Sequence, residues 1–192
     1  AMPLVGDVGV ASATDRPRAS ALADRFSIPD VFTDIDDLLD YDELDAVVVA
    51  SPSHLHEPQV LQLLAAGVDV LCERPLSLAS KGIERILAAA ARGNRKVFVA
   101  NNHRFRSDVQ ALARFLSGGE LGKLSGVRAG AYHPRGKIEG WRLRRQEAGG
   151  GALFEQGFPL VDLAMWLADF PVPERVWCHI DRARGANAVE ES

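Results

Sequence analysis

Short apolar runs alternate with segments of helical periodicity over the first half of the chain. The runs occupy residues 8–11, 31–32, 46–50, 68–72 and 96–100. Three of them, at 46–50, 68–72 and 97–99, are uniformly apolar, which is typical of strands that are covered on both faces. Because strands and helices alternate, the pattern predicts a parallel sheet flanked by helices.

The segments between these runs carry apolar residues at i, i+3, i+4 and i+7, the spacing of one helix face. The predicted faces are Val60, Leu63 and Leu64, closed by Gly67; then Ile83, Ile86, Leu87 and Ala90; then Val109, Leu112, Ala113 and Leu116. Residues 18–26 are also helix-like. Ser107 is a candidate cap of the third helix and Gly118-Gly119 its end.

The pattern changes after Gly122, where a second unit begins. Residues 127–132 and 176–180 are predicted to be strands, and the long connection between them contains a helix with Leu160 and Leu167 on its apolar face. Pro159 has no N–H to donate, so this helix should be kinked or begin at Phe158, leaving Glu155 in the preceding loop. We expect one domain over 1–122 and part of an α+β open-faced sheet domain over 123–192.

Composition and charge narrow the class of protein. The chain has 192 residues, of which 47% are hydrophobic and 25% charged, with a formal net charge of −4. Such a chain folds, and its mixed charges present no field that attracts nucleic acid or an anionic membrane. Its two cysteines, Cys72 and Cys178, make no disulfide framework. With no apolar run long enough to span a membrane, the sequence favours a cytoplasmic protein with a small-molecule or protein partner.

Polar residues follow three of the predicted strands. Ser51, Pro52, His54 and His56 follow the first, Glu73 and Arg74 the second, and Asn101 and Asn102 the third. Parallel sheets bind ligands beyond the carboxyl ends of their strands, so these residues are candidates for a site. The two histidines lack a third ligand at metal spacing, and we expect no metal.

These motifs, in this order, resemble the Gfo/Idh/MocA family of NAD(P)-dependent oxidoreductases, which act mostly on sugars, inositols and related polyols. The resemblance rests on Ser51-Pro52-x-His54-x-His56, Glu73-Arg74-Pro75, Asn102-x-Arg104-Phe105, Gly118-x-Glu120-Leu121-Gly122, Trp141-Arg142 and Gly149-Gly150-Gly151-Ala152-Leu153-x-x-x-Gly157, with Asp162 beyond it. It implies an α/β fold, a Rossmann-like parallel sheet with helices on both faces, and the activity of an oxidoreductase.

The resemblance also implies roles for individual residues. Ser51, Pro52, His54, His56, Glu73 and Asn102 would line the cofactor, and Trp141, Arg142 and Asp162 would contact a substrate. Arg74 stands where the family has a lysine, while Glu155 and Pro159 stand where it has aspartate and histidine. Arginine can position a substrate oxygen or stabilise an alkoxide, but it is a poor proton shuttle. Glu155 could act as a base, so Arg74 and Glu155 are the candidate catalytic pair, expected to face one cleft and form an ion pair.

The cofactor remains open between NAD and NADP. Asp15 could accept a hydrogen bond from a ribose hydroxyl and Arg16 could hold a phosphate, or both could merely begin a helix. The family's first strand and glycine-rich turn have no counterpart, because an apolar run follows Gly6 and Gly9 instead of a helix. Without this first βα unit, the strands at 8–11 and 46–50 should be completed by pairing that this chain does not encode, for instance in a swapped dimer.

Two functions therefore follow from the sequence. One is an oxidoreductase of sugar, inositol or polyol-like substrates with altered catalytic residues, working as a homo-oligomer. The other is a non-catalytic descendant that binds a sugar-like ligand or a partner subunit. The joint change of lysine, aspartate and histidine favours the second, and the number of family motifs favours the first.

Overall fold

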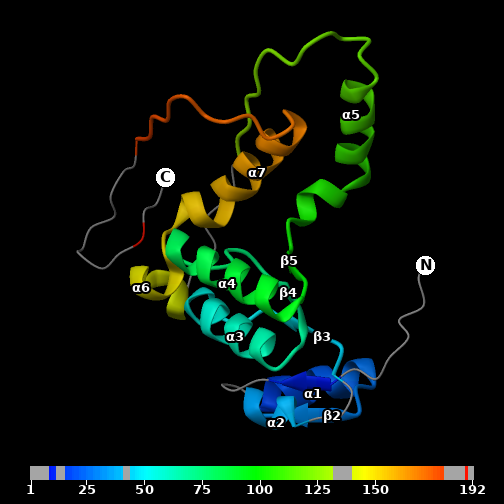
Figure 1. Cartoon of the computed structure of the whole chain (residues 1–192), viewed down its shortest axis with the longest axis vertical. Helices are drawn as coiled ribbons and strands as arrows, with labels where there is room; N and C mark the ends of the chain where they lie inside the picture. Colours follow the sequence, from blue (N-terminus) through cyan, green and yellow to red (C-terminus); the bar gives the residue numbers. More distant parts are fainter. Residues whose placement is uncertain (1–8, 12–15, 41–43, 132–139, 180–188, 190–192) are drawn as a thin grey trace.

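Five short parallel strands and the helices between them make up the first part of the chain (Figure 1). The computed structural model describes residues 9–11, 16–40, 44–131, 140–179 and 189. The elements of this part are β1 (Gly9–Ala11), α1 (Arg16–Phe26), β2 (Asp30–Phe32), α2 (Ile35–Leu39), β3 (Ala46–Val49), α3 (Ser53–Ala65), β4 (Asp69–Cys72), α4 (Ser80–Gly93) and β5 (Val97–Val99). This is the predicted alternation, and the fold is the Rossmann-type α/β fold.

The strands belong to two separate sheets. β1 pairs with β2, and β3, β4 and β5 form a second sheet in that order, all in parallel. Within the described residues β1 and β3 are not paired with each other. The direct β1–β3 pairing that would have contradicted the sequence analysis is thus not observed, and completion of the sheet by another strand stays a prediction.

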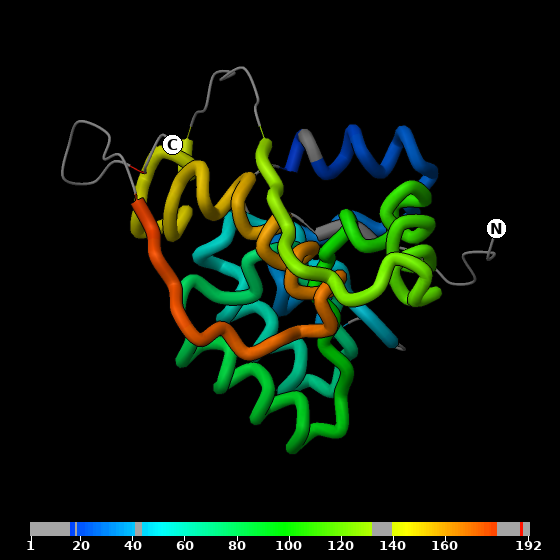
Figure 2. The backbone as a smooth tube through the Cα atoms, turned by 90° about the horizontal axis from the view of Figure 1, so that it is seen from above, coloured from blue at the N-terminus to red at the C-terminus, as the bar shows by residue number. Residues whose placement is uncertain are grey.

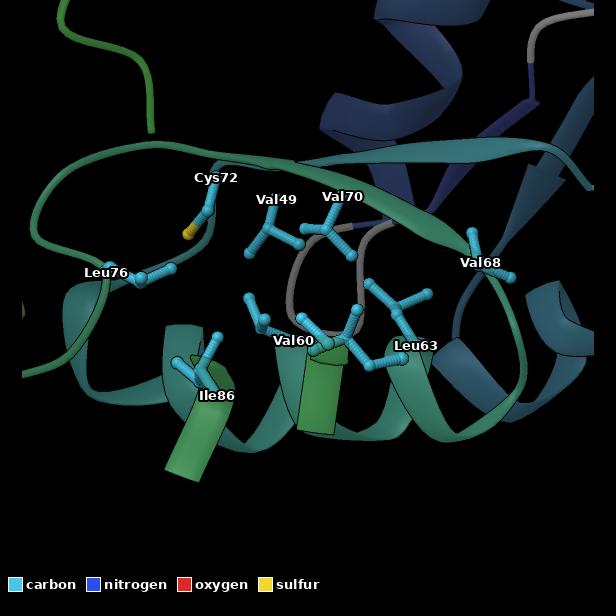
Figure 3. Packing of buried hydrophobic residues seen from close by; sticks show 10 residues of the cluster. Val49, Val60, Leu63, Val68, Val70, Cys72, Leu76 and Ile86 are labelled. Atoms are coloured by element: carbon cyan, nitrogen blue, oxygen red, sulfur yellow. The ribbon is translucent and has the colours of Figure 1, made fainter. Parts of the chain in front are cut away.

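The core lies between the β3–β5 sheet and helices α3 and α4 (Figure 3). Val60, Leu63 and Ile86 from the helices are completely buried against Val70 and Cys72 of β4. Each such side chain contributes roughly 1.5–3 kcal/mol by leaving water. Burial also raises the pKa of the Cys72 thiol to about 12, so the thiol packs as a small apolar group.

The other face of the same sheet is open. Val48 is 65% exposed and Phe98 55% exposed, and both alternate with buried or half-buried neighbours along their strands. The expectation that these strands are covered on both faces is therefore wrong for β3 and β5, whereas no residue of β4 is exposed. A uniformly apolar run shows that a strand can be covered, but it does not identify the element that covers it.

A hydrogen-bonded contact joins α3 to α4 beside the core. Glu57 of α3 accepts a hydrogen bond from Ser77 Oγ at 2.7 Å and is ion-paired with Arg85 of α4. Gly82 lies against this group, because a Cβ atom there would stand 2.0 Å from Glu57 Oε2 and 2.1 Å from Ser77 Oγ. The two helices approach closely here only because residue 82 has no side chain.

The elements described in the second part of the chain are all helical, and the other described segments carry no regular structure. This part contains η1 (Asn102–Phe105), α5 (Ser107–Ser117), η2 (Gly140–Leu143), α6 (Arg145–Ala148), a π-helical turn η3 (Leu153–Gly157) and α7 (Phe158–Leu167). α7 begins at Phe158, as Pro159 predicts, but Glu155 lies in the π-helical turn and not in a loop. Ser107 is the first residue of α5 and provides no side-chain cap.

Two predicted strands are wrong where the structure describes them. Residues 127–131 and 176–179 are not in strands, and the segment after α7 runs as an extended trace (Figure 2). Val176 and Trp177 are 81% and 85% exposed, and Val127 is 46% exposed. Their β-branched and aromatic composition favours a strand, but a strand needs a paired neighbour, and the described residues supply none.

Candidate functional site

The carboxyl ends of β3, β4 and β5 lie side by side, as the sequence predicts. Glu73 N donates to Val49 O at 2.8 Å, and Ala100 N donates to Cys72 O at 2.9 Å. The ladder therefore places Ser51, Glu73 and Asn101, which follow the three strands, along one edge of the sheet. This edge is where a parallel sheet receives a ligand.

His56 supports this edge from inside. Its side chain is 1% exposed, and its Nδ1 and Nε2 lie 2.7 Å from the carbonyl oxygens of Pro75 and Ser51. The ring thus links the segment after β3 to the segment after β4. Because both ring nitrogens contact carbonyl oxygens, His56 supports the turn from inside. No ring nitrogen of His56 is left for the predicted contact with a cofactor.

The other predicted cofactor residues differ in what their side chains do. Ser51 Oγ donates to Gln59 Oε1 at 2.5 Å, Glu73 and Asn102 are exposed, and Pro52 precedes α3. His54 Nδ1 is buried with no hydrogen-bond partner. Arg16 is the exposed first residue of α1, and Asp15 lies outside the described residues.

Arg74 reaches from the end of β4 to the π-helical turn. Its Nη1 donates a hydrogen bond of 3.0 Å to the backbone carbonyl of Phe154, eighty residues away in the chain. The predicted ion pair with Glu155 is not formed, because the guanidinium meets the backbone of the preceding residue. Arg74 and Glu155 are nevertheless brought to the same part of the molecule.

Glu155 pairs instead with a residue of η2. Its Oε1 lies 3.2 Å from Arg142 Nε, and the Arg142 guanidinium stacks 4.6 Å from the centre of the Trp141 ring. Trp141, Arg142 and Glu155 were predicted separately as substrate and catalytic residues, and the structure brings them together. About half of each charged side chain remains exposed, so the pair is accessible to a ligand.

Asp162 is held by residues that follow β5. Arg104 forms a two-pronged ion pair with its carboxylate, and Asn101 Nδ2 donates to Asp162 Oδ1 at 3.0 Å. The Arg104 guanidinium also lies over the Phe170 ring, 5.2 Å from the ring centre. Asp162 thus joins α7 to the sheet edge, and these contacts occupy the carboxylate that was predicted to contact a substrate.

Sequence reasoning counted Asn101 among the candidates that follow the strands but gave it no role, and it did not select Arg104 as a site residue. Both were visible as the polar residues directly after β5, and Arg104 belongs to one of the family-like motifs. The missing information was the partner, since Asp162 lies 58 residues after Arg104 in the chain.

Arg144 and Glu147 form another ion pair at the surface, and the hydrogen bond from Arg144 is the main cause that lowers the pKa of Glu147.

The strand edge fits one end of a dinucleotide. An orphaned polar atom, His54 Nδ1, lies in the first turn of α3, and the half-buried Ser51 and exposed Asn102 belong to the same edge. These groups can form hydrogen bonds with one end of a dinucleotide. Among the described residues no group of three or more histidine, cysteine or acidic side chains could hold a metal ion.

No described helix is long and apolar enough to cross a membrane.

Comparisons with known proteins agree with this architecture. Residues 7–101 match the family model described as "Oxidoreductase family, NAD-binding Rossmann fold", and residues 109–192 match the GFO/IDH/MocA C-terminal domain. The chain is 30% identical over 190 residues to the 1,5-anhydro-D-fructose reductase of Ensifer adhaerens, covering 97% of this chain and 56% of the relative. It is 40% identical over 127 residues to a putative UDP-kanosamine synthase oxidoreductase subunit of Amycolatopsis mediterranei, covering 65% of this chain and 35% of the relative.

A solved structure gives the same result for the fold. GenD2 from gentamicin A biosynthesis, in complex with NAD, superposes with a TM-score of 0.82 at 28% identity, covering 96% of this chain and 52% of that one. The chain therefore spans about half the length of that structure and of the reductase, and about a third of the subunit.

Proposed function

Because this chain belongs to the Gfo/Idh/MocA oxidoreductase family, we propose that it serves NAD(P)-dependent oxidation or reduction at a hydroxyl-bearing carbon of a sugar or cyclic polyol. Relatives named for such chemistry support this substrate class. They include a D-glucoside 3-dehydrogenase of Escherichia coli, 29% identical over 164 residues, and inositol 2-dehydrogenases, 33% identical over 111 residues. That this protein itself acts on a sugar or cyclic polyol is part of the proposal.

The observation that carries the proposal is the meeting of η3 with the sheet edge. Arg74, from the end of β4, bonds to the carbonyl of Phe154, and Glu155 is the next residue. A candidate proton acceptor and a fixed cation thus lie where a bound nicotinamide would end. Two distant segments of the sequence contribute these two groups, as a site between the sheet and the second part of the chain requires.

The residues divide the chemistry among themselves. A bound nicotinamide cofactor would supply the hydride acceptor or donor. Glu155 would take the hydroxyl proton, and its exposed ion pair with Arg142 opens at little cost, since such pairs contribute about 0–1 kcal/mol. Arg74 has N–H groups beyond the one that Phe154 accepts, and these would stabilise the developing alkoxide. His54 and Ser51 would hold the cofactor's amide end.

A non-catalytic binding protein is the second candidate. The pairing of Glu155 with Arg142 favours it, because the carboxylate already has a partner and would have to leave it to accept a proton from a substrate. Trp141 beside Arg142 would then serve only as a binding surface for a sugar ring. Binding without turnover distinguishes this function from the first.

The test is cofactor binding followed by turnover. NADH and NADPH are each titrated with the protein while their fluorescence is recorded. Oxidation of methyl glucoside and myo-inositol by added NAD⁺ or NADP⁺ is then followed through formation of the reduced cofactor. We expect binding, turnover of at least one compound, and a loss of turnover of about 100-fold in Glu155→Gln. Glu84→Gln, an exposed carboxylate of α4, is the matched control and should retain the full rate.

If neither NADH nor NADPH binds, the proposed cofactor binding and the proposed proton transfer are both refuted. Binding without turnover would favour the non-catalytic candidate. The choice between NAD and NADP is read from the same titration. The expectations of a cytoplasmic location and a homo-oligomer stay predictions.

A further inference from the structure

The π-helical turn leaves one backbone carbonyl without a helical donor. Phe158 N, which would bond to Phe154 O in an α-helix, donates instead to Leu153 O. In the π-helical pattern the donor for Phe154 O would be the next residue, Pro159, which has no N–H. Neither the α-helical nor the π-helical donor is therefore available to the carbonyl of Phe154.

Arg74 supplies the missing donor. Its Nη1 lies 3.0 Å from Phe154 O, in a part-buried contact between the end of β4 and the turn. A carbonyl removed from water without a partner destabilises the fold, whereas a hydrogen bond from a charged donor is among the stronger ones. The guanidinium is held by this bond because the proline has left the oxygen free.

We propose that Arg74 and Pro159 are a matched pair of positioning residues, in which Pro159 frees the carbonyl of Phe154 and Arg74 uses it to hold the Glu155 turn against the end of β4. The inference rests on the proposed function for its catalytic meaning, because Glu155 is the proton acceptor there. A residue with an N–H at position 159 would supply the π-helical donor to Phe154 O. The carbonyl would then no longer depend on Arg74 for a partner.

A double-mutant cycle tests the pairing without any assay of activity. The free energy of unfolding is measured in urea for the wild type, Arg74→Met, Pro159→Ala and the double variant. Methionine keeps an unbranched side chain but has no donor. We expect Arg74→Met to lower the folding equilibrium constant about tenfold or more in the wild type, and by less than about threefold when residue 159 is alanine. Arg128→Met, at an exposed arginine, is the control for loss of a surface charge.

Arg74→Lys adds a conservative rescue. Lysine retains a donor, so it should recover most of the stability that methionine loses. Equal losses for Arg74→Met in both backgrounds would overturn the pairing. If Pro159→Ala does not fold, the two single changes at position 74 decide the matter, and Arg74→Lys being no more stable than Arg74→Met would overturn the pairing equally.

Turnover separates a positioning role from a merely structural one. Pro159→Ala should lower kcat about tenfold or more and leave the Kd for NADH within about twofold, since the turn moves while the ends of the strands do not. A parallel loss of NADH affinity would contradict the positioning role. If the wild type neither binds nor turns over NADH, the proposed function fails, and the stability cycle still decides the pairing.

Discussion

Replacing Gly82 by alanine should break the contact between α3 and α4. The new Cβ atom would stand 2.0 Å from Glu57 Oε2 and 2.1 Å from Ser77 Oγ, distances that no packed side chain tolerates. Ser77 cannot move freely, because its Oγ donates to Glu57 and accepts from Ala79 N at 3.1 Å. The alanine must therefore displace the Glu57 carboxylate, the serine hydroxyl, or both.

Three magnitudes decide the sign of the effect. Alanine gains up to about 1 kcal/mol over glycine in a helix. Against this, loss of a hydrogen bond to a carboxylate costs about 1.5–3 kcal/mol, and overpacking costs about 1–3 kcal/mol. We expect Gly82→Ala to lower the free energy of unfolding by about 2–4 kcal/mol, measured by urea denaturation followed by circular dichroism.

The same helix contains a matched control. A Cβ atom at Gly93 would lie 3.5 Å from Arg95 Cγ and Leu64 O, which are ordinary contacts, so Gly93→Ala should be neutral or stabilising by up to about 1 kcal/mol. Adding Ser77→Ala to Gly82→Ala should cost less than the sum of the two single changes, because both remove the same hydrogen bond. If Gly82→Ala is as stable as Gly93→Ala, the close packing of α3 on α4 at this point is wrong.

Three further predictions concern other groups. The hydrogen bond from Ser77, followed by the contact with Arg85, holds the pKa of Glu57 below its ordinary value. The stability that Glu57 contributes is therefore present above the pKa of the unfolded carboxyl group and lost as the pH falls through the pKa of the folded one. Glu57→Gln should flatten this acid part of a curve of Tm against pH, and an unchanged acid part would contradict the prediction. Alanine replacements of Arg104 and Asp162 should show a coupling free energy of about 1–3 kcal/mol in a denaturation cycle, whereas additive effects would disprove the ion pair's role. Cys178 should react with a thiol reagent in the folded protein and Cys72 only on unfolding, and rapid modification of both would show that Cys72 is not buried.

Periodicity predicted the first part of the chain well because its signals are local. The apolar runs and helix faces of β3, α3, β4 and α4 specify these elements and most of the core between them. On the predicted face of α4, Ile86 and Ala90 are buried, whereas Ile83 and Leu87 are exposed. The start of α7 was also predictable, since a proline in the first helical turn acts on its own neighbours. The segments at 127–131 and 176–179 failed for the opposite reason, because a strand depends on a partner that local composition does not reveal.

The sequence identified candidate site residues but not the contacts that they make. Arg74 was predicted because it follows a strand, and Glu155 because it lies in the glycine-rich segment. Instead of the expected ion pair, Arg74 donates to Phe154 O and Glu155 pairs with Arg142. Opposite charges on distant segments indicate that an ion pair is possible, but backbone geometry decides which one forms. The free carbonyl of Phe154 depends on a change of helical hydrogen bonding that no residue pattern displays.

That change of hydrogen bonding also sets the angle between two side chains. Glu155 and Asp162 are seven residues apart, and in an uninterrupted α-helix they would project from the same side, almost two full turns from each other. The π-helical turn takes up one extra residue, which rotates everything before it by about 100° relative to α7. Asp162 therefore meets Arg104 while Glu155 meets Arg142, so two carboxylates that a regular helix would place on one side have different neighbours.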